Sequence, residues 1–559
     1  MTDIQSAEDH QKWWKSAVVY QIYPRSFADS SGDGVGDLKG ITSRLDYLVD
    51  LGVDAIWLSP FFLSPMADFG YDISDHCAVD PLFGTMADFD ELLAEAHARE
   101  LKVILDFVPN HISDQHEWFQ AALSSVDDPQ RDWFHWAPPA ADGGPPNNWT
   151  EAFGPDSAWT LDESSGEYYL HLFLPEQPDV DWNNPAVVQA MHQVLRFWMD
   201  KGVDGFRADV VHCIGKDPEL PDMPEELVGL PAMLQDFGPG THEQMRGLRK
   251  LVDSYPGDRM IVGETAFFDT ERMTSYVGPD KLNLAFNFTA THCPWDAASW
   301  RAEAQLTYDL LERSDSWASW VLSSHDTPRQ ATRIGRQEAA RAAAVLLLTL
   351  RGTPFLYMGE ELGLENGEIP DESVVDPGGR DGCRTPMPWT SEPDHGWPGG
   401  SWLPFSADST IRSAEQEAGD PSSMLELYRS LLRLRKKTPA LLHGEIEFLD
   451  APEGVLRWRR TITGPVGNSA EGGSTGATVG TKGSASGDTS DDGRGSAPTV
   501  LEIAINFTPE RVEAAISDGE VLITSSGGSD RPGIDGQTAD PGSGLVALGP
   551  DEARIVSPR

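Results

Sequence analysis

The sequence predicts an α/β protein with a (β/α)8 TIM barrel, an inserted subdomain after the third strand and a C-terminal β-sandwich domain. Eight short apolar segments alternate with amphipathic helical stretches between residues 18 and 361. Most of these segments are almost continuously apolar, which is typical of parallel strands buried on both faces. After about residue 440 the pattern changes to short strands without intervening helices.

The barrel strands are the first elements to place. Each is a short run rich in Val, Ile, Leu, Phe and Trp. We expect them at residues 18–27, 55–60, 102–108, 205–210, 260–265, 282–288, 317–326 and 353–361. Their alternation with helices favours a closed parallel barrel.

Helical patterns fill most of the gaps between the strands. The clearest cover residues 38–51, 87–100, 185–201, 241–252, 302–313 and 336–350. Gly52 and Gly202 follow two of them, where a helix C-terminus favours glycine.

Two regions interrupt this regularity. Residues 109–176 are rich in Trp, Pro, Gly and Asn and are too long for an ordinary loop. We therefore divide the chain into a first barrel part (1–108), an inserted subdomain (109–176), a second barrel part (177–440) and a C-terminal β domain (441–559). Within the last, residues 464–498 have a Gly/Ser-rich composition typical of a disordered loop, for which we expect no function.

Composition excludes several classes of function. Lys and Arg number 42 against 89 Asp and Glu, which gives a net charge of −47. Such a chain is repelled by nucleic acid and by anionic membranes, and no apolar run of about 18 residues predicts a membrane span. The four cysteines lack CxxC spacing, and the N-terminus lacks a secretory signal pattern, so we expect a cytoplasmic protein. As a separate expectation, the protein is a monomer or a weak homo-oligomer. The acidic composition favours solubility. A more specific hypothesis is that it adapts the protein to high salt.

Polar residues, most of them ionisable, gather where the predicted strands end. They are Asp106, Asn110, His111, Arg207, Asp209, His212, Glu264, His325 and Asp326. The carboxyl ends of barrel strands converge on one face, and such charges are costly to bury without a function. These residues therefore predict an active site.

The segments that carry these residues are specific. DFVPNH, GFRADVVH, GET and SSHD, in this order, resemble the conserved regions of glycoside hydrolase family 13, the α-amylase family. QPDVDW, YDISDH and RTPMPW narrow the resemblance to its oligo-1,6-glucosidase and α-glucosidase branch. The resemblance covers about residues 13–440.

The resemblance implies a retaining mechanism, which needs two carboxyl groups about 5–5.5 Å apart. It implies that Asp209 is the nucleophile, Glu264 the acid/base and Asp326 a third carboxylate that binds sugar hydroxyls. Arg207 lies two residues before Asp209, on the same strand face, so we expect its charge to keep Asp209 ionised.

The same resemblance implies a binding pocket for the non-reducing glucose. Tyr71 and Asp72 match residues that stack on and hydrogen-bond this sugar, His111 and His325 match residues that bind its hydroxyls, and Arg384 matches an arginine that closes the pocket. Three further residues match its walls: Phe153, Phe173 and Gln177.

Three positions leave linkage specificity open. Asp181 stands where the family usually has Asn, and His212 could touch the leaving group or cap the strand end. Val210, directly after the proposed nucleophile, resembles the residue of relatives that act on α-1,6 linkages.

A metal site is expected early in the chain. Asp29, Ser31, Asp33, Val35 and Asp37 offer oxygen donors at alternate positions, similar to the first part of an EF-hand loop. Position twelve is Gly40 instead of Glu, so the EF-hand is incomplete. The resembling branch binds Ca²⁺ at the matching loop, which favours a structural Ca²⁺ over Mg²⁺ or a metal-free turn.

The leading hypothesis is an exo-acting retaining α-glucosidase that acts on short α-glucosides such as maltose, isomaltose or sucrose, without an organic cofactor. A transglucosylase or sucrose isomerase would use the same intermediate. A non-catalytic binding protein of this fold is disfavoured because Asp209, Glu264 and Asp326 are all present. The expected pocket closure disfavours an endo-acting amylase.

Overall fold

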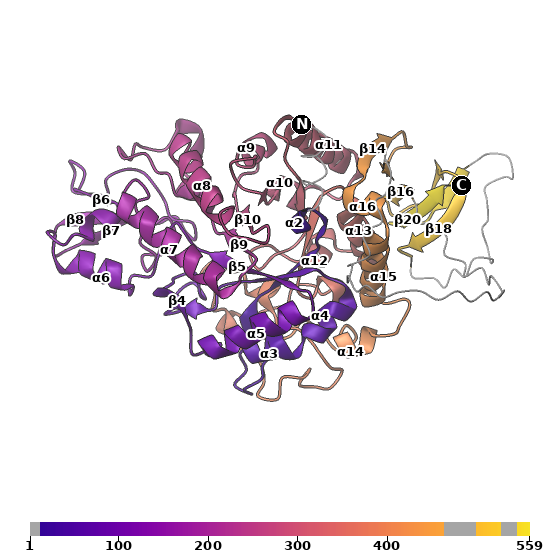
Figure 1. Ribbon diagram of the computed structural model, residues 1–559, viewed down its shortest axis with the longest axis horizontal. Helices are drawn as coiled ribbons and strands as arrows, with labels where there is room; N and C mark the ends of the chain where they lie inside the picture. The colour runs from indigo at the N-terminus through magenta and orange to yellow at the C-terminus, as the bar shows by residue number, and fades with distance from the viewer. Residues whose placement is uncertain (1–11, 463–498, 527–544, 559) are drawn as a thin grey trace, which may run out of the picture.

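The computed structural model describes residues 12–462, 499–526 and 545–558 (Figure 1). Its centre is a sheet of eight parallel strands in the order β11-β10-β9-β5-β2-β1-β13-β12. The strands are β1 (Val19–Ile22), β2 (Ala55–Leu58), β5 (Lys102–Phe107), β9 (Gly205–Ala208), β10 (Met260–Gly263), β11 (Leu284–Ala285), β12 (Ser319–Val321) and β13 (Thr353–Tyr357). Each coincides with an expected segment but is shorter.

The sheet is almost closed into a barrel. β11 and β12 are the two ends of the strand order, and the hydroxyl of Ser319 donates to the carbonyl of Ala285 across them at 2.6 Å. The predicted (β/α)8 barrel is therefore confirmed.

Helices surround the barrel, and most of them lie between its strands in the sequence. The longer ones are α5 (Met86–Ala98), α7 (Pro185–Lys201), α8 (Pro239–Val252), α11 (Ala297–Arg313), α13 (Gln337–Thr349) and α15 (Met424–Lys437). The shorter ones are α2 (Trp13–Ser16), α3 (Leu38–Ser43), α4 (Leu45–Leu51), α9 (Thr270–Ser275), α10 (Phe288–Thr291), α12 (Gln330–Ile334), α14 (Ala414–Glu417) and α16 (Pro439–His443).

Local sequence explains where these helices begin and end. Thr85 and Asp88 form a capping box at the start of α5. Gly52 and Gly202 end α4 and α7 in the left-handed conformation, as expected. The helix expected at residues 38–51 is divided into α3 and α4 at Arg44, which leaves the helical conformation.

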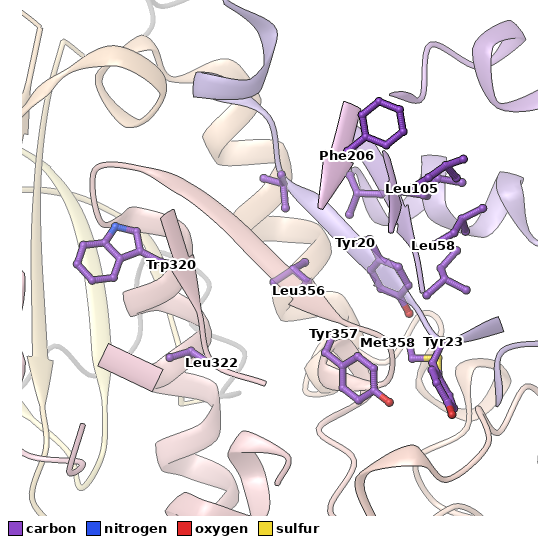
Figure 2. Packing of buried hydrophobic residues seen from close by; sticks show 14 of the residues in the cluster. Tyr20, Tyr23, Leu58, Leu105, Phe206, Trp320, Leu322, Leu356, Tyr357 and Met358 are labelled. Carbon is purple, nitrogen blue, oxygen red and sulfur yellow. The ribbon is translucent and has the colours of Figure 1, made fainter. Parts of the chain in front are cut away.

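Alternate strand residues face two different cores. Val19, Ala55 and Ile104 belong to the cluster inside the barrel. Their chain neighbours point outward into the larger core under the helices, which includes Tyr20, Leu58, Leu105, Phe206 and Leu356; Figure 2 shows these side chains on neighbouring strands. Successive side chains of a strand point to opposite faces of the sheet. Polar side chains can therefore lie at the mouth of the barrel while their neighbours stay in the core under the helices.

The inserted region contains a small subdomain of its own. It holds α6 (Glu117–Ser124) and a three-stranded antiparallel sheet of β6 (Trp136–Ala137), β8 (Glu167–Leu170) and β7 (Trp159–Asp162). A separate hairpin, β3 (Phe62–Leu63) with β4 (Asp75–Val79), follows β2. Both lie at the carboxyl ends of the barrel strands and border the site described below.

The C-terminal part is an antiparallel β domain. Its five-stranded sheet runs β14 (Glu445–Leu449), β15 (Val455–Thr461), β16 (Val500–Asn506), β20 (Ala553–Pro558) and β18 (Gly519–Thr524). A two-stranded sheet, β17 (Val512–Ala515) with β19 (Leu545–Leu548), shares a buried cluster with it that includes Val455, Ala504 and Leu548. The sequence did not predict β17. The Gly/Ser-rich loop expected at residues 464–498 lies outside the described residues.

Candidate active site

The site forms where β9, β10 and β12 end. Backbone pairing continues past the strands, because Asp209 donates its N–H to Phe107 and Glu264 donates its N–H to Ala208, both at 2.8 Å. These bonds fix the backbone of both acidic residues. His325 and Asp326 follow β12 at the same edge of the barrel.

Arg207 joins the carboxylates. Its Nη1 donates to Asp106 Oδ1 at 2.7 Å and to Asp209 Oδ1 at 2.6 Å, and its Nη2 donates to Glu264 Oε2 at 2.6 Å. Since Arg207 is 1% exposed, these charges interact in a poorly solvated environment. One guanidinium therefore holds Asp209 and Glu264 side by side.

Burial and charge act in opposite directions on the carboxyl groups around Arg207. Burial raises the pKa of Asp209 well above its ordinary value; Arg207 opposes this shift, whereas Glu264, Asp106 and Asp326 add to it. Burial likewise raises the pKa of Asp106 to about 6, again against Arg207. Arg207 therefore acts on Asp209 in the direction that the sequence indicated, but three carboxylates share its charge. The ionisation of Asp209 stays a prediction.

Val210 directly follows Asp209 with a strained backbone. Its φ is 30° and its ψ is 42°, in the left-handed region that a β-branched residue avoids. Its N–H donates to Glu264 Oε2 at 3.1 Å, so the turn helps to hold the second carboxylate. Such strain costs about 1–3 kcal/mol and is typical of functional sites.

Asp326 is held by a second group of arginines. Arg380 Nη1 and Arg384 Nη2 donate to its Oδ1 at 3.0 and 3.2 Å. Burial alone would raise the pKa of Asp326, but His325 and these arginines lower it well below its ordinary value. Arg380 also donates to Asp68 Oδ1 at 2.5 Å. Asp376 Oδ1 accepts from both arginines, at 2.7 and 2.9 Å.

Tyr71 and His325 link the two groups. Their rings stack with centroids 5.4 Å apart, and Tyr71 Oη lies 2.6 Å from His325 Nε2. His325 Nδ1 lies 2.7 Å from Gln21 Nε2 on β1. Burial lowers the pKa of His325 well below its ordinary value, although the neighbouring Asp326 opposes this shift.

The inserted region supplies the opposite wall. His111 Nε2 lies 3.2 Å from Gln177 Nε2, which also donates to Asp68 Oδ2 at 3.1 Å. Phe173 packs against His111 at 4.9 Å and against Phe153 at 5.9 Å. Burial lowers the pKa of His111 to about 4.

These groups enclose a cavity of about 200 Å³, smaller than the ~300–1,000 Å³ of sites for drug-sized ligands. It is lined by Asp68, Tyr71, His111, Ala152, Phe153, Phe173, Asp209, Val210, Met233, Glu264, Asp326 and Arg380. Arg207, Gln177 and His325 support these residues from behind.

Asp72 and Arg384, like Arg207, Gln177 and His325, are expected binding residues that do not line the cavity. Asp72 is fully buried, and its oxygens accept from Ser64 Oγ and from the N–H groups of Ala67 and Asp68 at 2.8–3.0 Å. Burial raises the pKa of Asp72 to about 6, although these bonds oppose the shift. Arg384 is fully buried behind Asp326. The direct sugar contacts expected of Asp72 and Arg384 therefore find no support in this geometry.

Asp68 and Arg380 occupy the positions on the wall instead. Each lies four residues before the residue chosen from the sequence. Positive φ angles at Phe69 (47°) and Gly70 (113°) turn the chain between Asp68 and Asp72, so only Asp68 reaches the cavity. The sequence did contain a signal for these alternatives, because ADFGYD holds two acidic residues and RDGCR holds two arginines.

Comparisons with known proteins identify the family of the chain. Residues 21–444 match the family described as "Alpha amylase, catalytic domain". The chain belongs to the α-amylase family. It is accordingly a glycoside hydrolase, as the sequence motifs indicated.

Relatives of this α-amylase-family chain include two glucosidases. A "Probable alpha-glucosidase" of Rhizobium meliloti (strain 1021) is 42% identical over 81% of this chain and 88% of the relative. An "Oligo-1,6-glucosidase" of Parageobacillus thermoglucosidasius is 38% identical over 80% and 88%.

Solved structures of the family also match. The alpha-glucosyl transfer enzyme XgtA is 38% identical, with a TM-score of 0.84 over 98% of this chain and 100% of that one. A mutant of the trehalulose synthase MutB is 32% identical, with a TM-score of 0.84 over 97% and 99%. Both hydrolases and glucosyl-transferring enzymes therefore share this fold.

Two of the positions that left linkage open have local roles. His212 Nε2 lies 2.7 Å from the carbonyl oxygen of Met233, which orders the loop after β9. Asp181 Oδ1 accepts from the N–H and side-chain amide of Asn183 at 2.9 Å, in the turn before α7. Neither side chain lines the cavity.

The loop expected to bind metal lies before α3. Asp29 accepts N–H groups from Ser31, Gly32 and Gly34, and Asp37 accepts from Ser30 and caps α3 through Gly40 N–H at 2.7 Å. Across the described part of the chain, no three His, Cys, Asp or Glu side chains converge as a metal site would require. The donor atoms are of the class that Ca²⁺ prefers.

Proposed function

We propose that this enzyme is an exo-acting retaining α-glucosidase, which removes the non-reducing glucose from short α-glucosides. The observation that carries the proposal is the bridge from Arg207 to both Asp209 and Glu264 at the wall of a small cavity. Two carboxyl groups that contact the same guanidinium suit the retaining reaction, whereas the inverting reaction needs room for a water molecule between its carboxyl groups.

The first chemical step assigns one role to each carboxyl group. Asp209 attacks the anomeric carbon while the bond from that carbon to the leaving oxygen breaks, and Glu264 gives its proton to this oxygen. These roles require a proton on Glu264 and a negative charge on Asp209 when substrate binds. In the second step Glu264 takes a proton from water, whose oxygen displaces Asp209 and releases glucose.

Asp326 and its arginines hold the sugar in this proposal. Arg380 and Arg384 keep Asp326 ionised, so it accepts hydrogen bonds from sugar hydroxyls. The pair Asp68 and Arg380 closes the far end of the cavity, which explains removal of one terminal unit rather than cleavage within a chain.

The test is glucose release from equimolar maltose, isomaltose, sucrose and trehalose, with soluble starch for comparison. We expect release from at least one disaccharide and little from starch, with Val210 favouring isomaltose. Asp209→Ala should lose activity, whereas Asp181→Ala, an equivalent change outside the cavity, should keep it. Efficient cleavage of starch, or full activity of Asp209→Ala, would contradict the proposal.

A transglucosylase is the second candidate, because XgtA and MutB share the fold. It would pass the glucosyl group from Asp209 to a sugar instead of water. Consumption of a disaccharide at high concentration without matching free glucose would favour it.

Two properties complete the proposal. Calcium at residues 29–37 would have a structural role only. A cytoplasmic location is supported by the four cysteines, Cys77, Cys213, Cys293 and Cys383, which are all free thiols. No helix in the described ranges is long and apolar enough to cross a membrane.

A further inference from the structure

A strained turn carries Asp68 to the wall of the cavity. Phe69, the next residue, has a φ of 47°, in the left-handed region that a bulky side chain rarely adopts. Such a conformation persists only where the surrounding structure holds it. Asp72 accepts the N–H of Asp68 at 3.0 Å on one side of the turn. The contacts of the half-buried Phe69 ring must therefore help to hold the other side.

The Phe69 ring packs in a cluster around Arg25. The guanidinium carbon of Arg25 lies 5.1 Å from the ring centroids of both Phe69 and Trp402 and 5.8 Å from that of Phe83. The rings of Phe69 and Trp402 are 5.4 Å apart. A cation within about 6 Å of a ring centroid is attracted to the ring face. Arg25 and Trp402 therefore hold the Phe69 ring from two directions.

The charge of Arg25 is buried in this cluster. Arg25 is 8% exposed, and its Nε has no hydrogen-bond partner in the described part of the chain. A buried charge is unfavourable unless other groups compensate it, and here the aromatic rings do so in part. An apolar side chain would fill the same space without this cost, so space filling alone does not explain an arginine here.

Arg25 and Trp402 are anchored away from the cavity. Trp402 donates its N–H to the carbonyl of Gly34 at 3.0 Å and its Nε1–H to Ser26 Oγ at 2.9 Å. Gly36 donates its N–H to the carbonyl of Arg25 at 2.8 Å. The loop before α3 thus fixes both residues. Neither residue lines the cavity, so any effect on substrate must pass through other side chains.

We propose that Arg25 and Trp402 are positioning residues, which hold the turn at Phe69 so that Asp68 stays in contact with Arg380 at the closed end of the cavity. The inference rests on the proposed α-glucosidase function and adds two residues to the support of its sugar-binding site. A displacement of about 1 Å can cost about 100-fold in rate. We therefore expect loss of either residue to lower kcat/KM by about 10- to 100-fold.

The test is a double-mutant cycle on the hydrolysis of p-nitrophenyl α-glucoside. Trp402→Leu should lower kcat/KM about 10- to 100-fold in the wild-type enzyme. In Asp68→Asn the same change should cost less than about twofold, because the side chain through which Trp402 acts is already altered. Trp402→Phe keeps an aromatic ring and should recover most of the activity.

Two further variants support the cycle. Arg25→Met keeps the length of the side chain without its charge and should show the same dependence on Asp68, which provides a second cycle if Trp402→Leu does not fold. Arg44→Met is the matched control, because the Arg44 guanidinium lies 4.3 Å from the ring of Trp389 and neither residue lines the cavity. This control should leave kcat/KM unchanged.

The outcomes separate this inference from the function on which it rests. If the wild-type enzyme does not cleave the α-glucoside, the proposed function fails and takes the inference with it. If Asp68→Asn keeps full activity, or if Trp402→Leu and Arg25→Met do, the function stands and the inference is rejected. Equal losses in both backgrounds would also reject it. Partial unfolding would produce that result, and so would a route from Trp402 through Tyr23, 6.4 Å away, to His325.

Discussion

Replacing Lys216 with Met should destabilise the whole site region. Lys216 Nζ donates to Asn110 Oδ1 at 2.7 Å and to the carbonyl of Cys213 at 2.8 Å, and it lies 2.7 Å from Asp179 Oδ2. The side chains of Lys216 and Asp179 are both completely buried. This lysine thus joins the end of β5, the loop after β9 and the return of the inserted region to the barrel.

The expected magnitude follows from that burial. Removing one partner of a buried ion pair costs about 3–5 kcal/mol, because the other charge stays buried without compensation. Adding Asp179→Asn removes the uncompensated charge, so the double variant should recover about 1–3 kcal/mol relative to the sum of the two single changes. Lys39→Met is the matched control: Lys39 is largely exposed beside Asp88 and should cost at most about 1 kcal/mol.

Equilibrium unfolding in urea, followed by tryptophan fluorescence, measures these differences. A cost below about 1 kcal/mol for Lys216→Met would refute the reasoning, because a buried charge without compensation cannot be that inexpensive. Strict additivity in the double variant would refute it as well.

Three other expectations concern pH, substrate binding and metal. Burial alone would raise the pKa of Asp204, but its partners, first among them His97, lower this pKa. The stability that ionised Asp204 provides is therefore present above the ordinary carboxyl pKa of about 4. It is lost as the pH falls through the lower pKa of the folded protein. Asp204→Asn should cost about 1.5–3 kcal/mol at pH 7 and flatten the acid limb of a stability-against-pH curve, and an unchanged curve would contradict this. Asp68→Asn should lower kcat/KM at least about 100-fold with little change in melting temperature, whereas Asp72→Asn should mainly lower the melting temperature; the reverse pattern would show that we have misassigned the two acids. If residues 29–37 bind calcium, chelation should remove about one equivalent of metal and lower the melting temperature, and no change in either would exclude the site.

The barrel and its acidic residues could be predicted because both depend on local pattern. Apolar runs that alternate with helices specify parallel strands, and parallel strand ends meet on one face. Asp209, Glu264 and Asp326 therefore had to converge once their strands were recognised. The resemblance to family motifs added roles to positions that topology had already brought together.

The finer parts of the site depend on loop conformation. Asp68 and Asp72 are equally plausible in the sequence, and only the left-handed turn at Phe69 and Gly70 decides which one reaches the cavity. Met233 lies far along the chain from Val210 and is brought to it by contacts of a long loop with Thr150 and His212. Charge sharing around Arg207 was likewise hidden, because the sequence does not show that Asp106, Asp209 and Glu264 all contact the same guanidinium.

The most direct test of the account is to trap the covalent intermediate. Glu264→Gln should still form the glucosyl bond from α-glucosyl fluoride, whose leaving group needs no proton, but should hydrolyse it slowly because the base that activates water is lost. Peptide mass spectrometry is expected to find one glucosyl group on the peptide that contains Asp209, and none in Glu264→Gln combined with Asp209→Asn. A glucosyl group on another residue, or inversion of the anomeric configuration in the product of the wild-type enzyme, would contradict the assignment of Asp209 and Glu264.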